Sequence, residues 1–370
     1  MTAVEHRPDV AERTRKPLWR RVAGPLLSVA LIAAVFVWFL PQFTSLSDVW
    51  ASVVALTWLE MTVLLLAAIW NLATYQFLMV ATTPGMRLRE ATVSTETTTA
   101  VSNTVVGGAA ISLGLTYAMN TSWGFSRSRT SVSLLISGLW NNFAKLGLPV
   151  IALVLLAFTA PPTTGRLLAG ALGVVALVAC VVLLALLLRS PEGAARLGRG
   201  TGRIASAVLR PFGKGPVSGW DKATTRFRER TVLLLRARWH WITLATVVSH
   251  LSLFVVLLLA LRFAGVDGDQ VSLAEALAVF AFARLVTAIP FTPGGLGVIE
   301  LALITGLSTA GGPRALVAAA VLMFRALTYV LPIPIGLATY VFWQRNRSWR
   351  RPPNSAPRTE LVPERAPRTP

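Results

Sequence analysis

The sequence predicts an all-α polytopic membrane protein of eight hydrophobic segments, about six full spans and two broken, re-entrant helical hairpins in an inverted repeat. Three observations support this prediction. Apolar residues make up 54% of the 370 residues and charged residues only 14%, whereas roughly a quarter of a soluble domain is charged. Segment 167–188 holds no charged residue, and about 20 such residues span a bilayer as a helix. Glycine and proline interrupt two other segments.

Six segments are long enough and apolar enough to cross a membrane once. The first follows a basic leader and lacks a clear small-residue cleavage site, so we expect a retained span rather than a cleaved signal peptide. The predicted spans are 22–42, 58–80, 131–158, 167–188, 239–262 and 314–342.

Positive charge orients these spans. The chain has a net charge of +19, and its lysines and arginines gather in three blocks, six in 1–21, twelve in 189–238 and seven in 345–368. All three blocks flank apolar spans, which is typical of cytoplasmic flanks and argues against a nucleic-acid partner. We therefore expect a basic cytoplasmic tail at 1–21, a basic cytoplasmic loop at 189–238 and a disordered, proline- and arginine-rich cytoplasmic tail at 346–370.

Two segments do not have the composition of an ordinary span. Segment 91–118 is rich in serine and threonine, and segment 273–311 is apolar but interrupted by proline and glycine. Irregular backbone at membrane depth is tolerated only where protein or water satisfies it, so we expect hairpins that enter and leave on one side. Two full spans at 273–311 would keep the same termini and are the alternative. The residues expected at the two breaks are Gly107, Gly108, Pro293, Gly294, Gly295 and Gly297.

Each hairpin lies between two predicted spans, and the two triplets enter the membrane from opposite faces. This is the pattern of an inverted-topology repeat, in which broken helices meet near the midplane and form a transport site. The triplets are 58–80, 91–118 and 131–158, and then 239–262, 273–311 and 314–342.

Ionisable residues occur inside the predicted membrane segments. Lys145 lies at the centre of one span with Asn141 one turn before it, and Arg325 lies deep within another. A central charge costs about 2.5–3.5 kcal/mol on insertion scales, so it should face the bundle interior with a partner. The residues could form structural ion pairs, Arg284 with Glu300 and Arg325 with Glu96, or line a polar cavity that holds an anionic group such as phosphate. The candidate substrate-binding residues are Glu96, Asn103, Asn141, Lys145, Arg284, Glu300 and Arg325.

The sequence contains no recognisable catalytic or metal-binding constellation. Its one cysteine, Cys180, lies within an apolar span, and its three histidines lack metal-ligand spacing. We also find no Ser/His/Asp set and no phosphate-binding loop in a strand–helix context. We therefore expect no metal, no cofactor and no enzymatic activity.

Two motifs resemble those of a known family. PGGLGVIE at 293–300, followed by an arginine in LMFRALTYVLPIPIGL, resembles the second motif of the lysylphosphatidylglycerol synthase transmembrane-region family, which comprises flippase-like membrane modules. NTVVGGAAISLGLTYAM at 103–119 and WGFSRSR at 123–129 resemble its first motif region, although Val106 stands where the family often has proline. The resemblance covers 22–345, which we interpret as the transmembrane flippase-like domain. It implies two inverted re-entrant hairpins. It does not extend to the family's soluble aminoacyl-transferase domain, which we expect to be absent here.

We therefore expect a multi-pass protein of the bacterial plasma membrane, with both termini cytoplasmic and phospholipids as partners. The resemblance implies that it binds an anionic or zwitterionic phospholipid headgroup and translocates it between leaflets. One alternative is a membrane-embedded lipid-modifying enzyme that uses Glu300 or Glu96 as general base. Another is a non-transporting protein that presents lipid to a separate lipid-modifying enzyme.

The predicted orientation can be tested by cysteine labelling. Segments 43–57 and 263–272 carry no lysine or arginine and are predicted to lie outside. Cysteines placed at Ser47 and Asp269 should react with an impermeant reagent in intact cells, and one at Ser218 only after permeabilisation. External labelling at Ser218 in intact cells would show that the predicted orientation is wrong.

Overall fold

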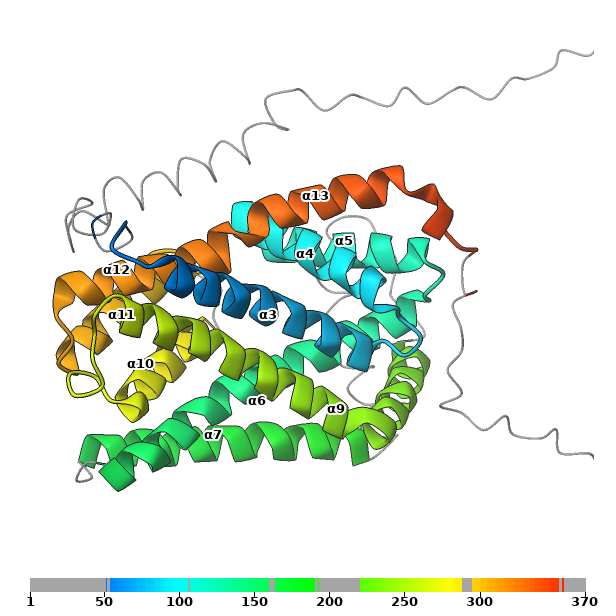
Figure 1. Cartoon of the computed structure of the whole chain (residues 1–370). Coiled ribbons are helices and arrows are strands. Elements are labelled where there is room, and N and C mark those ends of the chain that lie inside the picture. The colour runs from blue at the N-terminus through cyan, green and yellow to red at the C-terminus, as the bar shows by residue number, and fades with distance from the viewer. Residues whose placement is uncertain are drawn as a thin grey trace, which may run out of the picture.

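The computed structural model describes residues 54–105, 107–159, 164–189, 220–287 and 295–352, with the single residues 51, 192 and 355. Regular structure in these ranges is helical throughout, without strands (Figure 1). The predicted first span, the N-terminal tail and most of the basic loop lie outside the described residues. The structure therefore confirms the all-α fold class for the part that it describes.

Four of the described helices are long and apolar enough to cross a membrane. They contain four of the predicted spans, and a further helix, α7 (Thr164–Arg189), covers the predicted span 167–188. Large apolar side chains on their surface are exposed, including Trp58 at 84% and Phe158 at 83%. Such a surface suits lipid rather than water. The four helical stretches are Trp58–Thr82, Arg127–Phe158, Thr224–Phe263 and Arg314–Arg345.

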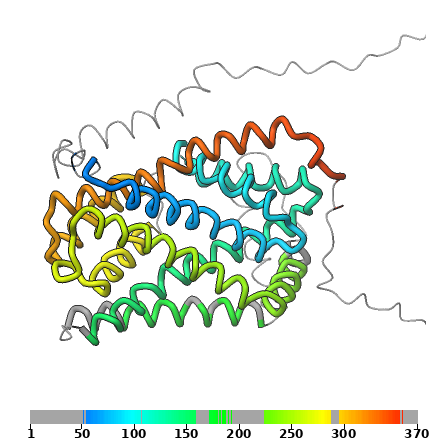
Figure 2. Tube along the Cα trace, viewed as in Figure 1, coloured from blue at the N-terminus to red at the C-terminus, as the bar shows by residue number. Residues whose placement is uncertain are grey.

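The first spans of the two predicted triplets, α3 (Trp58–Thr82) and α9 (Trp220–Phe263), pack along each other (Figure 2). The Asn71 side chain of α3 donates to the carbonyl oxygen of Ser249, at 3.2 Å, and to the Ser252 hydroxyl, at 2.8 Å. Because lipid is as apolar as leucine, polar contacts and close packing hold membrane helices together. Asn71 therefore joins the two halves of the protein.

Helix α9 begins nineteen residues before the predicted span at 239, so residues 220–238 of the predicted basic loop are helical. No proline or glycine interrupts this segment, and Leu234 and Ile242 are buried together in one apolar cluster. Charge composition placed the segment in the loop, but its apolar stripe packs against the bundle. Residues 220–238 therefore extend the helix beyond the predicted span.

The first hairpin consists of α4 (Leu88–Thr104) and α5 (Gly108–Ser122), which pack side by side. Gly107 has a φ of +72°, in the left-handed region that favours glycine. A Cβ on Gly108 would collide with the carbonyl oxygen of Val101. The interruption between α4 and α5 falls at this glycine pair, and both helices are shorter than the roughly 20 residues of a full span.

The second hairpin consists of α10 (Leu273–Val286) and α11 (Val298–Thr309), also in contact. Gly295 and Gly297 precede α11 with φ of +71° and +81°, as expected for a break, whereas Pro293 and Gly294 lie outside the described residues. The helices have 14 and 12 residues, each too short to span a bilayer alone. Their lengths favour the hairpin over the alternative of two full spans.

The helical stretch after the second hairpin changes its pitch at one point. After α12 (Arg314–Arg325) comes a π-helical turn, Ala326–Val330, followed by α13 (Pro332–Arg345). The Leu331 N–H bonds to the carbonyl of Ala326, five residues back, at 2.8 Å. Pro332 has no N–H, and in an α-helix its ring would meet the carbonyl four residues earlier. The wider turn accommodates the proline without ending the helix.

The predicted disordered tail, 346–370, begins with an ordered segment. Residues 347–352, here called the C-terminal strap, lie across the ends of the first hairpin. The Arg351 N–H bonds to the carbonyl of Ser122 at 2.9 Å, and its guanidinium donates to Glu90 at 2.9 Å. Trp349 lies 4.5 Å from the guanidinium of Arg89. Composition alone predicts disorder here because it cannot show that a buried carboxylate has its partner in the tail.

The strap contact can be tested by substitution. Glu90 is only 1% exposed, so Arg351→Ala leaves a buried acceptor unsatisfied, which costs roughly 1–3 kcal/mol. We expect a lower unfolding temperature in mild detergent, and the exposed neighbour Arg350→Ala is the control. Deleting 356–370 should leave the unfolding temperature unchanged. Deleting 346–370 should lower it at least as much as Arg351→Ala does. Equal unfolding temperatures for Arg350→Ala and Arg351→Ala would contradict the contact.

Candidate functional site

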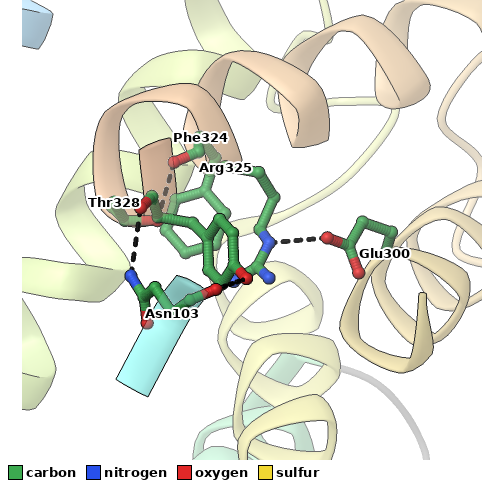
Figure 3. A network of polar contacts seen from close by, with 6 residues as sticks. Asn103, Glu300, Phe324, Arg325 and Thr328 are labelled. Atoms are coloured by element: carbon green, nitrogen blue, oxygen red, sulfur yellow. Dashed lines mark hydrogen bonds and ion pairs between the residues drawn. The ribbon is translucent and has the colours of Figure 1, made fainter. Parts of the chain in front are cut away.

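A buried ion pair joins the second hairpin to the helix that follows it. Arg325, the last residue of α12, donates from Nε to Oε1 of Glu300 at 2.6 Å (Figure 3). The two residues are 7% and 3% exposed. The guanidinium also lies over the ring of Tyr329, 4.5 Å from its centroid. Glu300 lies in the first turn of α11, directly after the break in the second hairpin.

The π-helical turn that follows Arg325 also contacts the first hairpin. The hydroxyl of Tyr329 donates to the carbonyl oxygen of Asn103, whose side-chain amide donates to the carbonyl oxygen of Tyr329 at 3.0 Å. Asn103 lies next to the last residue of α4, directly before the first break. Asn103, just before the first break, and Glu300, just after the second, therefore lie on either side of Arg325 and Tyr329. This convergence is what an inverted repeat of broken helices predicts.

The observed ion pair differs from both predicted pairs. Arg325 pairs with Glu300, rather than Glu300 with Arg284 and Arg325 with Glu96. Because α11 packs directly on α12, the first turn of α11 faces the last turn of α12. Glu96 lies seven residues before Asn103, about 10 Å along α4, and contacts Gln76 of α3 instead. The partners depend on helix packing, which the sequence spacing does not reveal.

A second group of ionisable residues comes from three helices, α6 (Arg127–Thr159), α9 and α10. Lys145 of α6 interacts electrostatically with Arg284 of α10, and His250 of α9 interacts with both. Lys145 is 8% exposed and His250 2%. We call these three residues the basic cluster.

The basic cluster has few partners among the described residues. Lys145 Nζ donates to the carbonyl oxygen of Thr287, at 3.4 Å, and His250 Nδ1 lies 3.0 Å from the carbonyl oxygen of Thr246. Arg284 Nε and His250 Nε2 are buried with no hydrogen-bond partner within the described ranges. Thr287 caps the C-terminus of α10, where the helix dipole favours a cation. The carbonyl end of α10 thus faces the Lys145 ammonium group, and no ion pair to a carboxylate compensates Lys145 or Arg284 in the described part.

The remaining predicted residues lie elsewhere. Asn141 is half-buried one turn before Lys145 on α6. Glu96 is 2% exposed, with a single hydrogen bond of 3.3 Å from the Gln76 amide to Oε1. The sequence prediction missed His250, Gln76 and Tyr329. His250 could have been predicted from the sequence, because an ionisable residue in the middle of a span is a functional candidate by itself.

Within the described ranges, no three histidine, cysteine, aspartate or glutamate side chains gather as a metal site would require. The candidate site residues comprise instead the Arg325–Glu300 ion pair, the basic cluster and the Glu96 carboxyl group, which belongs to neither. This arrangement suits the binding of an anion by hydrogen bonds and charge.

Comparison with known proteins identifies the family. The model of the family described as "Lysylphosphatidylglycerol synthase TM region" matches residues 26–336. The chain belongs to this family. Curated relatives include the phosphatidylglycerol lysyltransferases of Staphylococcus aureus strains COL, MSSA476 and MRSA252, each 35% identical over 96 residues. That alignment covers 26% of this chain and 11% of each relative, so the chain spans about a tenth of the length of these relatives.

The structural role of the ion pair leads to a stability prediction. Removing one member of a buried pair leaves the other charge uncompensated and costs about 3–5 kcal/mol. Arg325→Gln and Glu300→Gln should each lower the unfolding temperature strongly. The loss of stability in the double variant should be much smaller than the sum of the two single losses. Thermal unfolding of all four proteins in one detergent measures this coupling. Strictly additive losses would show that the two side chains do not stabilise each other.

Proposed function

We propose that this protein binds the phosphate of an anionic or zwitterionic phospholipid at the basic cluster and moves the headgroup between leaflets. The observation that carries the proposal is the pair of like charges on Lys145 and Arg284, with no carboxylate ion-paired to either among the described residues. Membership of the family and the apolar surface of the spans support a role with lipids. The family's name refers to a lipid synthase, so a lipid is the natural ligand class.

The electrostatics favour an anionic ligand. Two cations near each other in a medium of low dielectric repel, and each costs free energy to bury. A phosphodiester supplies the missing negative charge and accepts a hydrogen bond from the buried Nε of Arg284, which has no partner among the described residues. Charge-assisted hydrogen bonds of this kind are about twice as strong as neutral ones. Phosphate binding therefore compensates the repulsion between the two cations and gives the buried donor an acceptor.

The broken hairpins supply the movement in this proposal. Arg284 lies in the last turn of α10, immediately before the break, so it can shift with the hairpin while the long spans stay in place. The glycines before α11 have the backbone freedom that a hinge needs. Both hairpins are joined at Arg325 and Tyr329, so their movements are coupled. We place the protein in a bacterial plasma membrane, with cytoplasmic termini and hairpins that re-enter from one side.

A second candidate function is the presentation of lipid to a separate lipid-modifying enzyme. The curated relatives support it, because they are named as phosphatidylglycerol lysyltransferases and are about nine times longer than the aligned segment. In either function the chain itself carries out no chemical reaction. Mass analysis of the lipids separates both from an enzyme, since an enzyme changes the mass of the lipid.

Charge removal at the basic cluster tests the proposal. Lys145→Gln and Arg284→Gln each relieve repulsion, so both proteins should fold without the strong loss of stability expected for Arg325→Gln. Each should move phospholipid across proteoliposome membranes about tenfold more slowly or worse, which corresponds to about 1.4 kcal/mol. Lys145→Arg keeps the charge and should retain most of the activity.

The matched control is Arg345→Gln, which removes an exposed charge at the end of α13. Rates are compared per folded molecule, judged by monodisperse extraction in mild detergent. If Lys145→Gln and Arg284→Gln move lipid as fast as Arg345→Gln, the basic cluster is not the headgroup site. If the unmodified protein moves no lipid at all, the proposed transport function fails.

A further inference from the structure

Glu96 is buried in the middle of α4, the first helix of the first hairpin, and belongs neither to the ion pair nor to the basic cluster. It lies eight residues from either end of α4, about 12 Å along the helix axis. Only 2% of the residue is exposed. The helices α3, α5 and α13 pack along α4, and the C-terminal strap contacts its first turn, so the Glu96 side chain lies within protein.

The contacts of Glu96 are those of a neutral group. Gln76 Nε2 donates to Oε1 at 3.3 Å, while Gln76 Oε1 accepts the hydroxyl of Thr92 at 2.7 Å. The Thr92 hydroxyl also lies 2.9 Å from the carbonyl oxygen of Leu88, and the Gln76 amide presents its Nε2 donor to Oε1 of Glu96. Oε2 is buried and has no hydrogen-bond partner among the described residues. One carboxyl oxygen is therefore an acceptor, and the other is where a proton would reside.

No described charge compensates an ionised Glu96. On the other side of α4, Gly336 of α13 packs so closely that a Cβ there would collide with the carbonyl oxygen of Glu96 and with Ala100. Thr97 and Thr339 are hydrogen-bonded across the same interface, at 2.9 Å. The other titratable or charged residues on α4 and on the elements packed against it are Glu60, Tyr75, Arg89, Glu90, Tyr117, Tyr340 and Arg345.

An ionised carboxylate with one long hydrogen bond is costly inside a membrane protein, and a neutral carboxyl group is not. We propose, building on the proposed lipid transport, that Glu96 is a proton-binding site that couples headgroup movement to the movement of protons. The carboxyl group takes one proton from water on one side of the membrane and returns it to water on the other. Only an O–H bond of Glu96 forms and breaks, and the lipid is chemically unchanged.

The fold links the proton on Glu96 to the position of the hairpin. Loss of the proton creates a charge that must reach water or a cation, which requires α4 to separate from α3 or α13. The same helix ends at Asn103, whose contacts with Tyr329 hold the break beside Arg325. A change at Glu96 therefore alters the point at which the two hairpins meet.

The first experiment is independent of lipid transport. A protonated carboxyl group in a dry site has an infrared carbonyl band distinct from that of a carboxylate. The unmodified protein at neutral pH should show this band, and Glu96→Gln, which has the same hydrogen-bonding layout, should lack it. Glu60→Gln, at the exposed end of α3, is the control and should keep it. If the protein shows no such band, or if Glu96→Gln retains it, Glu96 is ionised and the proposal is wrong.

The second experiment tests coupling in proteoliposomes of phosphatidylglycerol and phosphatidylethanolamine with an imposed pH gradient. The gradient should drive phospholipid to one leaflet at least severalfold above its level without a gradient, with proton flux reported by a dye inside the vesicle. Glu96→Gln should lose both the gradient-driven enrichment and the lipid-dependent proton flux, whereas Glu60→Gln should keep both.

The outcomes separate the two proposals. If lipid moves equally with and without the gradient and no protons accompany it, the proton site is overturned while lipid transport stands. If the folded, unmodified protein moves no lipid under any condition, the transport function is overturned, and the infrared band alone decides the protonation of Glu96. Should Glu96→Gln fail to fold, the dependence of the unmodified protein on the gradient still decides the coupling.

Discussion

Arg325 and Glu300 neutralise each other where both side chains are almost completely buried, and the arrangement of the hairpins depends on this pair. The hairpin helices are too short to cross a bilayer, so their broken ends lie within the protein. Backbone groups at helix ends need partners, and lipid offers none. Arg325 holds Glu300 at the start of α11, and Tyr329, stacked beneath Arg325, holds Asn103 at the end of α4. One helical turn thus fixes both breaks.

The polar groups of the bundle divide by whether a partner satisfies them. Asn71 with Ser252, and Thr82 and Thr83 with Ser133, bridge neighbouring helices and hold the scaffold together. Many other hydroxyl groups bond to carbonyls of their own helix and need nothing more. Buried donors and acceptors without a partner among the described residues lie at the basic cluster and along α4 near Glu96, and also at Asn120, Arg228, Ser249, Glu300 and Ser308. In a membrane protein such groups are expensive to keep, and the proposed phosphate and proton would satisfy those at the basic cluster and at Glu96.

The sequence predicted the spans and the breaks well, because hydropathy and glycine or proline act locally. Gly107, Gly108, Gly295 and Gly297 are at the breaks for reasons that a single residue carries, namely a positive φ or a close approach of backbone. The ion-pair partner of Arg325 was not predictable, because any of several carboxylates in the membrane segments satisfied the same local rule. The start of α9 and the strap were missed for the same reason. Leu234 and Arg351 are ordered by contacts with distant residues, which composition does not encode.

The π-helical turn after Arg325 has a consequence for the register of the whole helix. One additional residue in a turn rotates everything beyond it by about 100°. Residues of α12 and α13 that a regular helical wheel places on one side therefore point in different directions. The helix uses this offset: α12 faces α9 and α11 of the second repeat, whereas α13 lies against α4 of the first (Figure 1). The contact face of one continuous helix thereby points in two directions. The part before the turn packs on the second repeat, and the part after it packs on the first.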